Sequence, residues 1–212
     1  SQDLEVIKEG CFENCYALTS VKNLLPKSLT KLGNDQSNPV FFDNKALQGE
    51  VIVGPYLEEI NLRTFRGSKI GSVVAAKNGL KTLGQYCFYA CNDLTNIVLS
   101  ATIEKLDYSI LEGTSNSSAQ RKIYLRNFPS GGITSSLFNE TKTEHITVYL
   151  PWEYREEWRN FAATNTAHTF TFNGETKVLP TLKTELGTWK ATYTQKVGWW
   201  QESPDPLLIF IK

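Results

Sequence analysis

The sequence is short of most residues that mark a chemical function. Its 212 residues include no methionine, two histidines and four cysteines, and its 22 basic and 22 acidic side chains give zero net charge. A balanced chain has no overall field to hold nucleic acid or an anionic membrane. No apolar run approaches the roughly 20 residues of a membrane-spanning helix. The composition argues against both classes, whereas 41% hydrophobic and 21% charged residues fit a globular protein.

The sequence also offers little to an enzyme. His145 and His168 have no neighbouring ligand pattern, and no Ser/His/Asp motif or phosphate-binding glycine loop is present. The glutamates of 153–157 lie beside Arg155 and Arg159, which predicts an ion-paired helix face rather than an acid–base pair. We expect no catalysis, no metal and no cofactor. The missing methionine leads us to expect a trimmed chain whose leader or anchor lies outside this sequence.

The four cysteines reveal a repeat. They form two C-x3-C pairs, Cys11 with Cys15 and Cys87 with Cys91. This spacing alone is compatible with zinc. However, leucine, cysteine, phenylalanine, cysteine, leucine and threonine recur in register over 4–21 and 80–97. The pairs therefore indicate one repeated structural unit rather than two separate sites.

Further copies lie between and beyond the pairs. The segments 57–60, 80–83 and 103–106 follow one another at intervals of 23 residues. The large apolar residue after the first cysteine position recurs at Phe12, Phe42, Phe65, Phe88, Leu111 and Phe138. In the unit of Phe42, the second cysteine position then falls on Lys45. Six units between Leu4 and Pro151 predict a solenoid, in which each unit is too small to bury its apolar face alone.

Each unit carries a short strand with alternating faces. The inward positions are Val51, Val73, Ile97, Ile123 and Val148, with Val53, Ala75, Leu99, Leu125 and Leu150 two residues later. The residues between them, here called the outward row, are Ile52, Val74, Val98, Tyr124 and Tyr149, preceded by Lys22 in the first unit. Ser20 and Glu50 belong to a polar rim. An exposed apolar row predicts a binding site; the alternative is that loops, the C-terminal extension or a second chain cover it.

The stacking of the repeat units also predicts whether the cysteines form disulfides. Units stacked at about 4.7 Å place the two cysteine pairs, three units apart, about 15 Å from each other, beyond the roughly 7 Å limit of a disulfide. We expect free cysteines, buried on a short helical turn, where a thiol packs as a small hydrophobe.

The pattern L-x-x-I-x-x-x-x-F-x-x-C-x-x-L-x-x-I resembles the BspA-type leucine-rich repeat, most closely over 80–99 and next over 4–21. Such repeats are common in bacterial surface proteins and occur in some protozoan ones. The resemblance covers roughly 4–151. It implies an α/β solenoid of short parallel strands and helical turns, without catalytic residues. It also implies binding or adhesion in a surface or secreted protein, and leaves the partner open.

The chain is expected to have two parts. Residues 1–151 form the solenoid, and residues 152–212 form a capping helix, over 152–163, and a β-rich extension that covers the last repeat. Asn173-Gly174 predicts a hairpin between strands at 169–172 and 176–179. Further strands are predicted within 187–194 and 207–211.

Three functions remain open at this stage. The first is a non-catalytic module at a cell surface that binds a protein or glycan through the outward row. The second is a structural subunit of a virion or surface assembly, in which the same face self-associates. The third is a carbohydrate-binding protein that uses Trp199 or Trp200, of which a strand would expose at most one; both side chains would otherwise pack in the cap.

Overall fold

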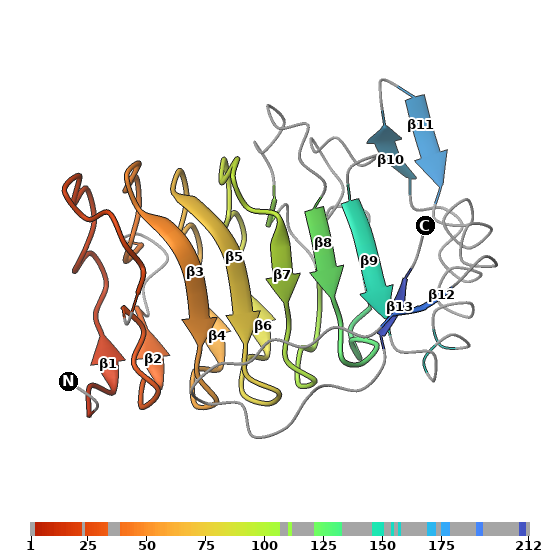
Figure 1. The fold of residues 1–212 in the computed structure, drawn as a ribbon, viewed down its shortest axis with the longest axis horizontal. Coiled ribbons are helices and arrows are strands. Elements are labelled where there is room, and N and C mark those ends of the chain that lie inside the picture. The colour runs from red at the N-terminus through yellow and green to blue at the C-terminus, as the bar shows by residue number, and fades with distance from the viewer. Residues whose placement is uncertain are drawn as a thin grey trace.

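The computed structural model of this chain is a stack of short parallel strands (Figure 1). The structure describes residues 3–22, 24–33, 39–106, 110–111, 121–132, 146–150, 154, 157, 169–172, 175–178, 190–192 and 208–210. From residue 146 onward, only 154 and 157 are described beyond their backbone.

One sheet of seven strands runs along the stack, in the order β12-β13-β9-β8-β7-β5-β3. The repeat strands are parallel to one another: β3 (Gln48–Val53), β5 (Lys69–Ala75), β7 (Asn96–Val98), β8 (Arg121–Tyr124) and β9 (Ile146–Leu150). Parallel neighbours need a connection that returns to the same end of the sheet. The fully described connections, 54–68 between β3 and β5 and 76–95 between β5 and β7, return around the stack in this way, so the predicted solenoid is confirmed.

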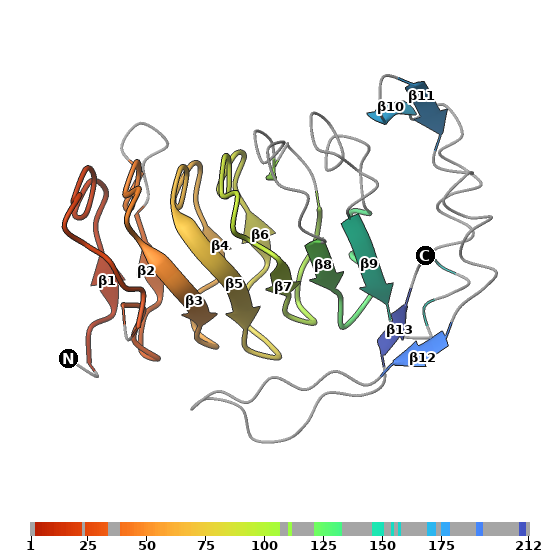
Figure 2. The ribbon, with the colours of Figure 1, turned by 45° about the horizontal axis from the view of Figure 1, so that its top comes forward.

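Shorter strands lie behind the large sheet (Figures 1 and 2). They form two parallel pairs: β1 (Val6–Ile7) with β2 (Lys31–Leu32), and β4 (Glu59–Ile60) with β6 (Thr82–Leu83). A unit thus runs from a long strand through a loop to a short strand, and then through a turn to the next long strand.

The register of the long strands agrees with the predicted alignment. Val51 pairs with Val73, Val73 with Ile97, and Ile97 with Ile123. These residues, and the inward residues two positions later, are buried in one apolar core that runs the length of the repeats: Val51, Val53, Val73, Ala75, Ile97, Leu99, Ile123 and Leu125. The side chains of Val148 and Leu150 lie outside the described residues.

A column of phenylalanine rings marks the turn side of the core. The ring centroids are 5.2 Å apart from Phe12 to Phe41, 5.2 Å from Phe41 to Phe65 and 6.0 Å from Phe65 to Phe88. The prediction that Phe42 belongs to this column is wrong, since its neighbour Phe41 occupies the position. The backbone N–H of Phe41 bonds to Thr64 and leaves Phe42 on the outside. The second cysteine position in this unit is consequently Asn44 rather than Lys45.

The connections in the described repeats are turns, so the predicted helical turns are wrong. Non-glycine residues adopt positive φ two residues after the stacked ring at Asn14, Asp43 and Ala90, and two residues before it at Arg63 and Tyr86. A left-handed residue ends a helix. Including Gly10 and Gly67, such positions lie on both sides of Phe12, Phe65 and Phe88 and leave no room there for a helical turn. The predicted capping helix lies outside the described residues, apart from Tyr154 and Glu157.

Four later strands lie close to the predicted ranges. β10 (Thr169–Phe172) and β11 (Glu175–Val178) pair antiparallel across Asn173-Gly174. β12 (Lys190–Thr192) pairs antiparallel with β13 (Leu208–Phe210), and β13 pairs antiparallel with β9. The last strands of the chain therefore extend the large sheet beyond the repeats.

Candidate binding face

The outward row is a continuous line of direct strand partners. Ile52 pairs with Val74, Val74 with Val98, Val98 with Tyr124, and Tyr124 with Tyr149. The strands thus bring together all five residues that the sequence predicts as a binding site. The side chain of Tyr149 lies outside the described residues.

The middle of this row is not open to solvent. Val74 and Val98 are each 2% exposed and Tyr124 is 8% exposed, within a single chain. With Ala76 they form a second apolar cluster, separate from the main core, and the partly buried Ile52 packs against it. The expectation of an exposed row is therefore wrong for these three residues. The sheet is covered on both faces here, as parallel sheets generally are, which agrees with the alternative of a covered row.

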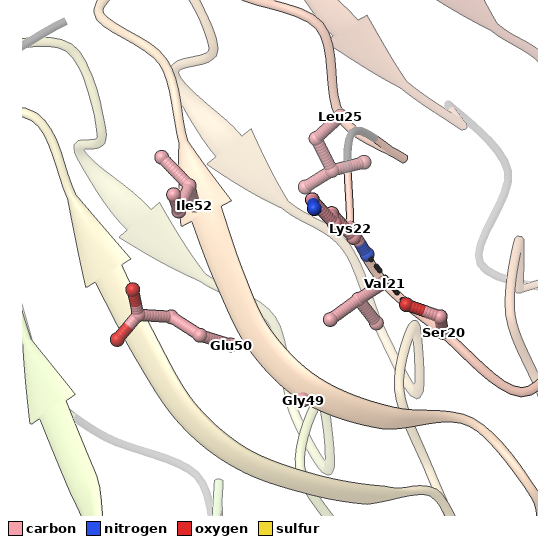
Figure 3. Close-up of a pocket in the computed structure, with 7 residues that line it drawn as sticks. All are labelled: Ser20, Val21, Lys22, Leu25, Gly49, Glu50 and Ile52. Atoms are coloured by element: carbon pink, nitrogen blue, oxygen red, sulfur yellow. Dashed lines mark hydrogen bonds between the residues drawn. The ribbon is translucent and has the colours of Figure 1, made fainter. Parts of the chain in front are cut away.

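The row opens at its β3 end into a pocket of about 420 Å³ (Figure 3). The pocket is lined by Ser20, Val21, Lys22, Leu25, Gly49, Glu50 and Ile52. Of these, sequence reasoning missed Val21, Leu25 and Gly49. A glycine within a strand pattern is a recognised signal for a bulge, and β3 has a register shift between Gly49 and Glu50.

The pocket exists because the first unit pairs with β3 only as far as Gln48. Ser20 pairs with Gln48, and the last bond of this ladder joins the Val21 N–H to the Gln48 carbonyl at 3.2 Å. Among the described residues, no backbone hydrogen bond joins the first unit to β3 beyond Gln48. Lys22 therefore does not continue the outward row, contrary to the prediction. Gly49, with φ of 111°, bends β3 at the same place.

The pocket combines an apolar side with two opposite charges. Ile52, Leu25 and Val21 supply aliphatic surface, and Lys22 and Glu50 lie on either side (Figure 3). Glu50 is oriented by Ser72, whose hydroxyl donates a 2.9 Å hydrogen bond to Glu50 Oε2. The exposed Lys22 keeps its ammonium group in solvent beside the pocket. The site suits a ligand with one apolar group flanked by polar or charged groups.

The backbone of β3 also faces this opening. The Val53 carbonyl accepts a 2.9 Å bond from Ala76, so the polar groups of Val53 point toward β5. Successive residues of a strand direct these groups to opposite sides, so those of Ile52 point toward the open edge. An edge strand offers such groups to an added strand.

The two cysteines of the second pair are structural rather than reactive. Cys87 and Cys91 are buried and free. Burial raises the pKa of Cys91 to about 11 and that of Cys87 well above its usual value of 9.0. Cys91 Sγ donates to the Phe65 carbonyl at 3.0 Å. The prediction of buried thiols is wrong for the exposed Cys11 and the half-buried Cys15, because the first unit lies at the end of the stack.

No other chemistry emerges from the part of the chain that the structure describes. That part contains no group of three or more His, Cys, Asp or Glu side chains arranged to hold a metal ion. Nor does it contain a helix with the length and hydropathy needed to cross a membrane.

Comparison with known proteins agrees with the repeat geometry. A family model described as the BspA type leucine rich repeat region (6 copies) matches the chain over residues 1–38 and 38–154. The resemblance to this family is thereby confirmed, and the number of six units stays a prediction. No curated protein and no solved structure matches the chain.

Proposed function

The chain belongs to the BspA-type leucine-rich repeat family, and we propose that it is a non-catalytic module that binds a protein partner at the β3 end of its outward row. Repeat solenoids of this family are typically binding scaffolds, and the proteins that carry them are generally surface or secreted. We propose the same setting for this chain, at a bacterial cell surface.

The observation that carries the proposal is the pocket at the open edge of β3. An extended segment of the partner that lies along β3 would hydrogen-bond to the backbone of Ile52 and place one apolar side chain against Ile52 and Leu25. Such strand addition takes affinity from main-chain bonds and specificity from side-chain pockets. In the partner segment, Lys22 would favour an acidic residue on one side of the apolar residue, and Glu50 would favour a basic residue on the other side.

The other members of the outward row have different parts in this proposal. Val74, Val98 and Tyr124 stabilise the sheet next to the site, since they are buried against one another. Tyr149 occupies the far end of the same line and is a second candidate contact.

The test is binding of the full chain to an array of extracellular-matrix proteins and to a glycan array. We expect a protein ligand whose Kd rises about tenfold, or 1.4 kcal/mol, in Lys22→Glu, because this exposed charge borders the pocket. The matched control is Lys31→Glu, which makes the same charge change on β2, behind the sheet.

The outcomes distinguish the functions. Equal loss in both variants, or no loss in either, would contradict the β3 site. Binding to glycans alone, abolished by replacement of Trp199 and Trp200, would favour the carbohydrate-binding alternative. Self-association in sedimentation experiments that Lys22→Glu abolishes would make a second copy of this chain the partner, as in a surface assembly.

A further inference from the structure

A second surface stands out at the edge where the chain turns from the short strands into the long ones (Figure 2). Phe42, Arg66 and Tyr89 each follow a stacked phenylalanine by one residue, in three successive units. The guanidinium carbon of Arg66 lies 5.2 Å from the Phe42 ring centroid and 4.7 Å from that of Tyr89. Arg66 is thus held between two aromatic rings.

A second arginine joins the same surface. The guanidinium carbon of Arg63 lies 5.8 Å from the Tyr86 ring centroid, and Tyr86 meets Tyr89 edge-on at 5.8 Å. We call these five half-buried side chains the arginine–tyrosine edge: Phe42, Arg63, Arg66, Tyr86 and Tyr89.

The guanidinium group of Arg66 keeps its hydrogen-bonding capacity, whereas Nε of Arg63 is buried and has no hydrogen-bond partner. A ring that stacks on the face of a guanidinium leaves its N–H groups directed outward in the plane. Within the described residues, neither arginine has a carboxylate partner, and the nearby Asp43 is paired with Lys45 at 3.5 Å. Lys69, exposed at the start of β5, adds to the positive charge of the edge, whereas the charges of Lys45 and Asp43 offset each other.

The backbone gives a separate indication that these side chains matter. Arg63 and Tyr86 have φ of 53° and 58°, at the position where the first unit has Gly10. The left-handed conformation is unfavourable for an L-residue, and glycine avoids this cost. Strain of this kind concentrates at functional sites. Of the five non-glycine residues with positive φ, Arg63 and Tyr86 belong to the arginine–tyrosine edge, and Asn14, Asp43 and Ala90 lie in the same turns.

We propose that the arginine–tyrosine edge binds an anionic polysaccharide, one that carries sulfate or uronic acid groups. A guanidinium held in place matches the paired oxygens of a sulfate or carboxylate. A linear polysaccharide carries charges along its length, as the edge carries the cations Arg63, Arg66 and Lys69 at intervals of three residues. An acidic peptide would gain no strand pairing here, because the edge consists of turns.

The experiment measures binding of the full chain to a heparin fragment and to a polyuronate, with neutral dextran as the uncharged comparison. We expect both anionic chains to bind in a salt-dependent manner and dextran not to bind. Arg66→Gln should raise the Kd for heparin about tenfold. Arg66→Lys, which keeps the charge but loses the planar fork, should recover only part of that loss.

Lys31→Gln is the control, since it removes the same charge from the short-strand side. Equal effects of Arg66→Gln and Lys31→Gln would overturn the site, because they would indicate attraction by charge alone. Tighter binding of a glutamate-rich peptide than of either polysaccharide would overturn the ligand class. If Arg66→Gln lowers the melting temperature, Arg63→Gln, which loses only the Tyr86 contact, provides the same comparison.

Discussion

At the scale of single residues, the position three residues after the stacked ring holds different side chains, and in three units that side chain donates a hydrogen bond to a phenylalanine carbonyl. Three residues after the stacked ring, Asn44 donates a 2.6 Å bond to the Phe12 carbonyl, and Cys91 donates to the Phe65 carbonyl at 3.0 Å. Ser68, at the same position, also donates to Phe65, at 2.8 Å. A buried carbonyl without a donor costs about 1–3 kcal/mol. Cys91 thus takes the same hydrogen-bonding position in its turn as Asn44 and Ser68 do in theirs.

The buried thiol of Cys91 makes stability depend on alkaline pH. Its pKa is about 11 in the folded chain and near 9.0 when exposed, so its contribution is fully present below pH 9 and is lost as the pH rises to 11. The loss is about 1.4 kcal/mol for each pKa unit. Urea unfolding should show a smaller decline over this range in Cys91→Ser, whose hydroxyl does not titrate. The same decline in both proteins would contradict the assignment.

The left-handed residues predict a stabilising substitution. Ala90 has φ of 55°, at the position where Gly67 has φ of 76° in the preceding unit. Ala90→Gly should raise the free energy of unfolding by about 0.5–1 kcal/mol, because relief of the left-handed strain exceeds the added entropy of the unfolded chain. Thermal unfolding tests this. Ala75→Gly, in strand β5, is the control and should destabilise.

At the scale of elements, the strands of the large sheet are apolar on both faces. The inward residues form the main core, and Val74, Val98 and Tyr124 form the second cluster outside it. β3 differs because its outer neighbour leaves the ladder at Ser20, which opens the pocket at Ile52. The candidate site thus lies where repetition is interrupted.

The burial of the outward row leads to a prediction for Val98. Val98→Ala should lower the free energy of unfolding by about 1–3 kcal/mol, as expected of a core valine. Val6→Ala, at a strand valine that is 44% exposed, should change it by less than about 0.5 kcal/mol. Denaturant unfolding compares the two variants. Equal, small effects would mean that the outward row is open to solvent after all.

At the scale of the whole molecule, stability is shared between neighbouring units. Each phenylalanine ring contacts only the rings one unit away, from Phe12 to Phe88. In a solenoid, stability is the sum of such nearest-neighbour terms. A defect in the middle of the stack removes two interfaces, whereas a defect at its end removes one.

The phenylalanine column tests this arrangement. Phe65→Ala should lower the free energy of unfolding by about 3–5 kcal/mol, since the ring is buried between Phe41 and Phe88. Phe12→Ala should lower it by about half as much, because Phe12 is partly buried and stacks on one ring. Circular dichroism during urea unfolding measures both. Equal losses would contradict a stack with nearest-neighbour coupling.

Much of the fold followed from periodicity. Alternation along each strand sufficed to assign Val51 inward and Ile52 outward, and the interval of 23 residues aligned neighbouring units. Periodicity failed at Phe41, which lies 24 residues before Phe65, because the interval of 23 residues pointed to Phe42 instead. It also failed at the turns, because a helical turn and a pair of left-handed residues fit the same spacing.

The sequence by itself determined the repeat, its family and the inward and outward faces, because these depend on local alternation and on spacing along the chain. Only the tertiary structure decided which outward residues are accessible. Burial depends on what packs over the sheet, and the pocket depends on where the first unit leaves it. The same holds for Arg66, whose position between Phe42 and Tyr89 requires three units stacked in register.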